Sequence, residues 1–216
     1  IVDDCSDDDT DVIVKKYSDE DSRIKFYKNE INSGPANTRN KAISISKGRY
    51  VCFIDSDDLW KKNKLEKQIN FMEGKKIDFT YTDYTPFFDV NNKRYFKKEI
   101  IAPETFNFQK FIHNTSICTS SMIVLRELVH SIKFPKVKTL EDFPFKCKIL
   151  MKSSATKFNE NNTLYRITKN SLTSNKFKNL YTLFYINKKF NKLKFLENLK
   201  SVFSISIQSL KKYGYK

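Results

Sequence analysis

Apolar runs alternate with amphipathic segments along the first 82 residues of the chain. Residues 50–54 (YVCFI) form a continuous apolar run, which is typical of a strand buried in a parallel sheet. The same pattern predicts strands over residues 1–2, 23–27 and 78–84, and helices over residues 7–17, 35–46 and 61–72. Strands that alternate with helices in this way indicate an α/β fold with a doubly wound, mostly parallel sheet.

Proline and glycine mark the ends of these helices. Pro35 lies in the first turn of its helix, where the missing backbone N–H has no intrahelical partner to lose. Gly48 and Gly74 follow two of the predicted helices and are expected to end them.

The second half of the chain is less regular. Residues 93–101 are expected to pair with residues 81–90 as a hairpin around Asn91 and Asn92. Further predicted elements are strands over residues 119–125 and 163–167 and a helix over residues 140–151. After Ser174 the sequence becomes helical and basic, so we divide the chain into a catalytic domain (1–175) and a basic helical tail (176–216).

Positive charge is concentrated in the tail. The whole chain carries a formal net charge of +15, and residues 176–216 contain ten Lys and one acid. The basic residues are nearly all Lys, whereas recognition of bases and phosphates in nucleic acids favours the bidentate Arg side chain. We therefore expect no nucleic-acid partner. An anionic membrane surface suits a Lys-rich, aromatic tail better.

The numbers of cysteine and histidine residues and the hydropathy of the chain narrow the range of protein classes further. The four cysteines are widely separated and there are only two histidines, His113 and His130, so we expect no structural zinc site. Scattered single cysteines also suit a reducing compartment. No apolar run approaches the ~20 residues that span a membrane. We expect a cytoplasmic protein, with both histidines outside the catalytic machinery.

Acidic residues follow two of the predicted strands. Residues 1–2 run into Asp3 and Asp4, and YVCFI runs into Asp55, Asp57 and Asp58. In an open parallel sheet, ligands bind beyond the carboxyl ends of the strands. Closely spaced carboxylates at that edge repel one another, and Mg²⁺ or Mn²⁺ held jointly with substrate phosphates would relieve the repulsion. The alternative is that the acids cap the next helix, which suits Asp58.

Other D-x-D triplets show that the spacing alone means little. Asp7/Asp9, Asp9/Asp11 and Asp19/Asp21 have the same spacing, and each is interpreted as solvated acids at a helix start or in a turn. Only the triplet at Asp55 and Asp57 follows a buried strand, and only that triplet is predicted to bind a metal.

The segments around these acidic residues resemble those of family 2 glycosyltransferases. The run VDDCS with Asp8 and Thr10 is similar to the family's V-D-D-x-S-x-D-x-T segment. Asn32 to Gly34, then Arg39-Asn40 and GRY at 48–50, resemble its N-x-G-x-x-x-x-R-N…G-x-Y segment, and FIDSDD at 53–58 resembles its F-x-D-x-D-D. Order and spacing agree from residue 1 to about residue 68.

The second half resembles the same family more loosely. Thr119-Ser120-Ser121 with Arg126 is similar to an acceptor-side segment, and Glu141-Asp142 to the family's ED motif. LYR at 164–166 with NSL at 170–172 resembles the segment that follows. The family begins with an apolar strand that has no counterpart before Ile1. We therefore expect a missing first βα unit, and expect the chain without it to bind UDP poorly and to unfold without a sharp transition.

The resemblance implies the GT-A fold and an inverting transfer of a sugar from a nucleoside diphosphate, usually UDP, to an acceptor hydroxyl. On this sequence it implies that Asp4 accepts the N3–H of uracil and that Arg39 faces the nucleotide. It places Asp55 against the ribose or the metal, and Asp57 on a Mn²⁺ or Mg²⁺ ion that bridges the diphosphate. The alternative for Arg39 is a surface salt bridge.

Asp142 is our candidate for the general base, with Glu141 on the substrate side. The acceptor hydroxyl needs a base opposite the diphosphate, and in an acidic pair one carboxylate can orient while the other takes the proton. The alternative is that Glu141 and Asp142 only complement the helix dipole. Phe143 and Phe145 are assigned to the core rather than to sugar stacking, and Trp60 either walls the site or anchors the next helix.

The predicted function is synthesis of a bacterial surface polysaccharide or lipooligosaccharide from a UDP-sugar and a saccharide or lipid-linked acceptor. A nucleotidyltransferase and a non-catalytic, degenerate domain are the alternatives. In the tail, six apolar residues recur at helical spacing with lysines beside them: Leu193, Leu196, Leu199, Phe203, Ile207 and Leu210. This stripe either packs on the catalytic domain or lies on the inner leaflet of the cell membrane.

Overall fold

The computed structural model describes residues 1–168 and 176–214. The first half contains, in chain order, β1 (Val2–Asp3), α1 (Thr10–Glu20), β2 (Tyr27–Lys28), α2 (Pro35–Ile45), β3 (Tyr50–Cys52), β4 (Leu59–Trp60) and α3 (Lys64–Lys75). The middle contains β5 (Phe79–Val90), β6 (Lys93–Phe96), β7 (Thr105–Phe106), α4 (Phe108–Phe111), the 3₁₀ turn η1 (Thr119–Ser121), β8 (Ile123–Leu125), α5 (Arg126–Val129), α6 (Asp142–Leu150) and β9 (Ala155–Arg166). The last described helices are α7 (Lys176–Lys189) and α8 (Phe195–Tyr213).

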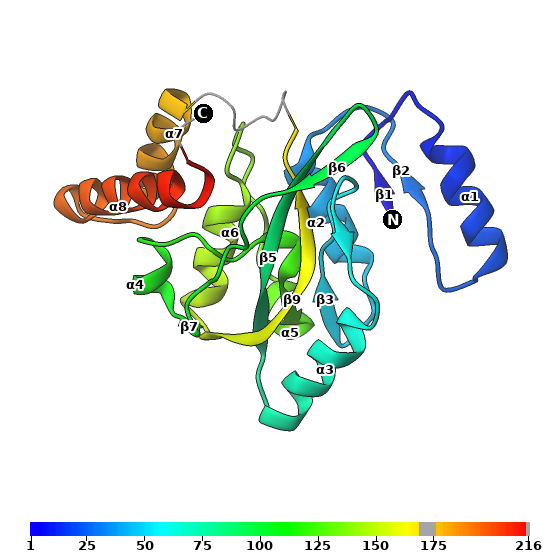
Figure 1. Cartoon of the computed structure of the whole chain (residues 1–216), viewed down its shortest axis with the longest axis horizontal. Coiled ribbons are helices and arrows are strands. Elements are labelled where there is room, and N and C mark those ends of the chain that lie inside the picture. Colours follow the sequence, from blue (N-terminus) through cyan, green and yellow to red (C-terminus); the bar gives the residue numbers. More distant parts are fainter. Residues whose placement is uncertain (169–175, 215–216) are drawn as a thin grey trace.

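The strands form two sheets. β1 and β2 pair in parallel as a small sheet of their own. The larger sheet has the order β3-β8-β5-β9-β4, with β6 added to β5 and β7 added to β9. Figure 1 shows β1, β2 and α1 at one end of the molecule and the helices α7 and α8 at the other.

The main strands of the larger sheet share one direction. β5 and β9 pair in parallel, and β8 is antiparallel to both β3 and β5, so β3, β5 and β9 all point the same way. β4, β6 and β7 are antiparallel additions. The predicted α/β class with a mixed second half is therefore confirmed, and the carboxyl end of β3 leads to the acidic cluster.

The hairpin predicted around Asn91 and Asn92 is present. β5 pairs with β6 from Phe87–Phe96 to Val90–Lys93. Asn91 and Asn92 have φ angles of 49° and 61°, in the left-handed region that a two-residue type I′ turn requires and that Asn tolerates best among residues with a side chain.

Several predicted bounds were wrong. The strand predicted over residues 23–27 is only Tyr27–Lys28, and the segment before it begins with a turn in which Ile24 N donates to Asp21 O (2.9 Å). The segment 119–125 begins as a 3₁₀ turn, and its strand starts only at Ile123. The third helix continues through Gly74 and ends at Lys75; the next residue, Lys76, has a φ of 54° and donates its N–H to Glu73 O and Met72 O.

The core is rich in aromatic side chains and lies between the larger sheet and α6. Phe134 stacks on Phe145 with ring centroids 3.8 Å apart, and Phe53 contacts both rings edge-on at 5.7 and 6.0 Å. Phe143 and Phe145 are buried, as predicted for core residues. This cluster fixes the start of α6 beside the end of β3.

The two tail helices pack on this core differently, α7 with apolar side chains and α8 with polar ones. Leu183 and Ile186 of α7 and Leu193 after it belong to the buried core. On α8, however, Asn198 and Ser201 are the buried residues, whereas Leu196, Leu199 and Phe203 of the predicted stripe are exposed. The alternative in which the whole stripe packs on the catalytic domain is therefore wrong.

Residues 169–175, which include the proposed domain boundary and Asn170, Ser171 and Leu172 of the resemblance, lie outside the described residues. Within the described part of the chain, we find no helix that combines the length and the hydropathy needed to cross a bilayer.

Candidate functional site

Asp4 binds the loop that precedes α2. Its Oδ1 accepts hydrogen bonds from Ser33 N (2.9 Å), Ser33 Oγ (3.0 Å) and Asn29 Nδ2 (2.9 Å), and its Oδ2 accepts one from Gly34 N (2.7 Å). Burial raises the pKa of Asp4, but the hydrogen bonds from Ser33, Asn29 and Thr38 lower it more, so the pKa lies below its ordinary value. Gly34 has a φ of 83°, which favours glycine where the loop turns into α2.

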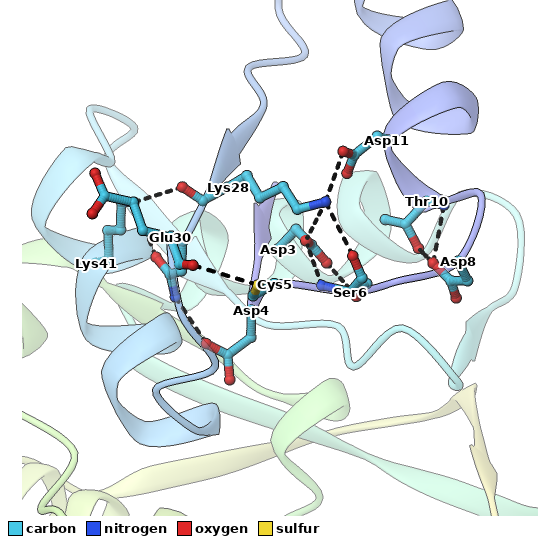
Figure 2. A network of polar contacts seen from close by, with 11 residues as sticks. Asp3, Asp4, Cys5, Ser6, Asp8, Thr10, Asp11, Lys28, Glu30 and Lys41 are labelled. Atoms are coloured by element: carbon cyan, nitrogen blue, oxygen red, sulfur yellow. Dashed lines mark hydrogen bonds and ion pairs between the residues drawn. The ribbon is translucent and has the colours of Figure 1, made fainter.

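The neighbouring acids of the same segment have local structural partners (Figure 2). Asp3 is buried and accepts from Ser6 N (2.9 Å) and Ser6 Oγ (2.5 Å). Lys28 Nζ donates to Asp11 Oδ2 (2.7 Å) and Ser6 O (3.0 Å). Figure 2 shows that the carboxylate of Asp4, the residue after β1, points away from this group.

Arg39 links the acid after β3 to the acids at the start of α6. Its Nη2 donates to Asp55 Oδ1 (2.6 Å) and its Nη1 donates to Glu141 Oε1 (2.7 Å). The guanidinium carbon lies 5.6 Å from the centroid of the Phe134 ring. Burial alone would lower the pKa of Arg39, but Asp55 and Glu141 raise it above its usual value, so the side chain is a fixed cation.

Asp57 and Asp58 have different surroundings. Asp57 is exposed, and its pKa is raised by partial burial and by the negative charge of Asp55. Asp58 is buried, accepts from Ser120 Oγ (2.5 Å) and Arg166 N (2.8 Å), and has its pKa raised to about 6, chiefly by burial. The prediction that Asp58 caps the next helix is wrong, because its side chain binds η1 and β9 instead.

The 3₁₀ turn η1 lies between the two acidic groups. Ser120 Oγ accepts from Asp55 N (3.1 Å) while it donates to Asp58, and Ser120 O accepts from the indole N–H of Trp60 (2.7 Å). Thr119, the residue before, donates from Oγ1 to Asp142 Oδ2 (3.0 Å). Two consecutive residues, Thr119 and Ser120, thus hold the loop after β3 against α6, and Trp60 binds the same turn.

Asp142 has one carboxylate oxygen engaged. Oδ2 accepts from Thr119 and from Lys146 Nζ (2.7 Å), and Lys146 also donates to Ile117 O (2.8 Å). Lys146 is almost completely buried, while a third of the Asp142 side chain is exposed. Burial raises the pKa of Asp142, but Lys146 and Arg39 lower it by more, so the pKa lies below its ordinary value. The pKa of Glu141 is raised by burial and by Asp142.

The acids after β3 suit a cation that is completed by a substrate. In the described residues there is no cluster of three or more His, Cys, Asp or Glu side chains that could hold a metal ion. Asp57 is nevertheless exposed beside Asp55, and its pKa is raised first by partial burial and then by the negative charge of Asp55. Mg²⁺ commonly takes only one or two carboxylates, with substrate phosphates as further ligands, so Asp55 and Asp57 fit such an ion.

The structure brings most of the predicted site residues together. Arg39 binds both Asp55 and Glu141. Asp142 follows Glu141 in the chain, and Asp57 is two residues from Asp55. Asp4 is connected to this group through α2, which begins at the loop that Asp4 binds and carries Arg39.

One residue, Lys146, and one contact, between Ser120 and Asp58, were missed from the sequence. Lys146 follows Asp142 by four residues in a predicted helix, so the spacing could have indicated the ion pair. Ser120 is 62 residues from Asp58, and no local pattern connects them.

Comparison with known proteins identifies the family. Glycosyl transferase family 2 matches residues 1–132, more than half of the chain. TuaG of Bacillus subtilis (strain 168), a glycosyltransferase provisionally assigned to teichuronic acid biosynthesis, is 37% identical over 198 residues, which cover 91% of this chain and 78% of TuaG. WfaP of Escherichia coli, named a UDP-Glc:alpha-D-GlcNAc-diphosphoundecaprenol beta-1,3-glucosyltransferase, is 37% identical over 187 residues, which cover 83% of this chain and 69% of WfaP.

A solved structure shows the same fold. The crystal structure of Staphylococcus aureus TarS 1-349 in complex with UDP-GlcNAc matches 97% of this chain with a TM-score of 0.69 at 20% identity. The chain spans 62% of the length of that TarS structure. This similarity confirms the predicted GT-A type of α/β fold. From the family match and the relatives together, the chain belongs to glycosyl transferase family 2, a family of glycosyltransferases.

Proposed function

We propose that the chain transfers a sugar, with inversion, from a UDP-sugar to a hydroxyl of a saccharide carried on a lipid diphosphate. The product would be part of a surface polysaccharide or lipooligosaccharide, built at the inner face of the cell membrane. The name of WfaP, which gives a UDP-glucose donor and a diphosphoundecaprenol-linked acceptor, supports this choice of substrates. The UDP-GlcNAc bound to TarS supports a UDP-sugar donor.

The observation that carries the proposal is the state of Asp142. Lys146 and Thr119 both bind Oδ2, so the carboxylate is held in one orientation, and no described residue donates a hydrogen bond to Oδ1, which can accept one from a substrate. A third of the side chain is accessible. As the acceptor oxygen attacks the sugar, its proton passes to Oδ1 of Asp142. Lys146 keeps this carboxylate ionised and ready to accept.

On the donor side, Asp4 reads the base. Its Oδ2 accepts only from Gly34 N among the described residues, and a carboxylate oxygen can accept a second hydrogen bond, which the N3–H of uracil can donate. Arg39, Asp55 and Glu141 bind the rest of the donor. Arg39 donates in a fixed fork, so that Asp55 and Glu141 are held on either side of it while the nucleotide sugar enters.

A divalent cation, Mn²⁺ or Mg²⁺, would be held by Asp57 and Asp55. When bound with the diphosphate it offsets the charge that develops on the leaving UDP. The exposure of Asp57 and its raised pKa support this assignment, because a cation would relieve the repulsion from Asp55.

Release of UDP tests the proposal. The chain is incubated with UDP-glucose, UDP-galactose and their N-acetylated forms, each with Mn²⁺, with Mg²⁺ and with EDTA, in the presence and absence of a lipid-diphosphate-linked saccharide. Acceptor-stimulated release of UDP from one donor, lost with EDTA, is the expected result. If no donor is turned over although UDP binds, the non-catalytic alternative holds. No observation favours the nucleotidyltransferase alternative.

A further inference from the structure

The apolar stripe of α8 faces away from the protein. Leu196 is 71% exposed, Leu199 is 45% exposed and Phe203 is 68% exposed. At 3.6 residues per turn these side chains share one side of the helix, and Ile207 and Leu210, both half-buried, continue it. Phe195, at the start of the helix, is 67% exposed. A helix of a water-soluble domain ordinarily turns such a side inward.

Hydrogen bonds set this orientation of α8. On the opposite side of the helix, Ser201 Oγ donates to Ile112 O (2.5 Å) and accepts from Asn187 Nδ2 (2.8 Å). Asn198 Nδ2 donates to Phe184 O (2.9 Å). A half-turn rotation of α8 would bury the stripe but would leave these buried polar groups without partners. Each buried polar group that loses its hydrogen bond destabilises the fold, so the arrangement with the stripe outward is the more stable one.

The charge around the stripe is almost entirely positive. Residues 176–214 contain nine lysines and one acid, Glu197. Lys200 and Lys211 follow Leu196 and Ile207 by four positions, so they lie along one edge of the stripe. Both are exposed, as are four lysines before the helix: Lys188, Lys189, Lys192 and Lys194.

We propose that α8 lies on an anionic lipid bilayer, with Leu196, Leu199 and Phe203 inserted at the level of the headgroups and acyl chains. An outward apolar stripe supplies the insertion, and lysines along its edge supply the attraction to anionic headgroups. In most such helices the polar side faces water, whereas in α8 it binds the rest of the protein. This inference is independent of the transfer reaction, although the same surface would bring the site to a lipid-linked acceptor.

Vesicle flotation with the full 216-residue chain tests the proposal. Vesicles with about one third phosphatidylglycerol should bind the chain at low salt, and pure phosphatidylcholine vesicles should bind it at least tenfold more weakly. The variant Leu196→Asp/Phe203→Asp should raise the lipid concentration for half-maximal binding at least tenfold. Val12→Asp is the matched control, because Val12 is 71% exposed on α1 at the other end of the molecule, and it should bind like the parent.

Three results would overturn the proposal. They are no binding to anionic vesicles at low salt, equal binding by the parent and the stripe variant, or a lipid-free dimer, seen by sedimentation velocity, that the stripe variant abolishes. The dimer would mean that a second copy of the chain covers the stripe.

A second measurement does not depend on the folding of a charged variant. Phe203→Trp keeps the residue aromatic, and the native chain has a single Trp, Trp60, whose signal the parent supplies as a blank. Brominated acyl chains should quench the added fluorescence severalfold more than they quench Trp60. Equal quenching at both positions would place α8 in water and reject the proposal.

Discussion

Arg39 and Glu141 are 102 residues apart in the sequence and form an ion pair of 2.7 Å. The same guanidinium binds Asp55, so one cation separates the acid that follows β3 from the acid that begins α6. Without it, these partly buried carboxylates would face each other uncompensated.

Replacement of Arg39 should therefore reduce stability. We expect Arg39→Met to lower the free energy of unfolding by about 1–3 kcal/mol, less than for a fully buried pair because Asp55 remains a third exposed. Urea denaturation measures the loss. Arg49→Met is the control, since Arg49 pairs with Glu73 at the surface and should change stability little. Equal losses in the two variants would show that the Arg39 pairs are no more than surface salt bridges.

The base assignment has a kinetic signature. Asp142→Asn should retain donor binding but cut sugar transfer by a factor on the order of 10²–10⁴, the usual contribution of general base catalysis. Calorimetry with UDP and steady-state UDP release measure the two quantities. A variant that loses donor affinity and keeps its transfer rate would identify Asp142 as a donor-binding residue.

Asp57 should be needed for the cation. We expect Asp57→Ala to abolish metal-dependent UDP binding, because Asp57 is the exposed carboxylate beside Asp55. Asp9→Ala is the control: Asp9 also belongs to a D-x-D triplet, but it lies exposed before α1. Calorimetric titration of UDP with Mn²⁺ or with EDTA separates the two variants. The same response from both would mean that the site is elsewhere.

Asp58 should make stability depend on pH. Its pKa is about 6 in the folded protein and ordinarily 3.8, so between these values the folded state holds a proton that the unfolded state has released. The contribution is present below about pH 4 and is lost as the pH rises through 6, with a magnitude on the order of 2 kcal/mol. Urea midpoints of the parent and of Asp58→Asn, compared from pH 4 to 7, isolate it. The difference between the two chains should change across this window, and a constant difference would contradict the assignment.

Much of the first half of the fold is predictable because its signals are local. The Pro35 helix is recognised from one residue with a fixed φ and begins where expected. The apolar run YVCFI correctly predicts a strand, but the strand is shorter than predicted (Tyr50–Cys52), Ile54 is exposed, and the strand pairs antiparallel with β8 at the end of the larger sheet rather than inside a parallel one. The hairpin at Asn91 follows from the same kind of local chemistry.

What the sequence does not reveal depends on distant partners. Thr119 to Ser121 has strand-like neighbours, yet its hydroxyl groups bind Asp58 and Asp142, and the chain winds into a 3₁₀ turn to reach them. In the tail, periodicity predicts a helix correctly but cannot say which side faces the protein. That is decided by Asn187 and Ile112, residues on other elements.

The way α8 is attached also has a consequence for local unfolding. Its contacts with the rest of the chain include hydrogen bonds from Asn198 and Ser201, a ring contact between Phe195 and Phe184, and the partly buried Val202 and Ile205, whereas β5 and β9 pair along most of their length in the middle of the sheet. Among the described side chains of α8 no apolar one is fully buried, and such a helix opens at a lower free energy than the sheet that carries the site. Amide hydrogen exchange should therefore show α8 exchanging by a separate, earlier opening, while the amides shared by β5 and β9 exchange only when the whole domain unfolds.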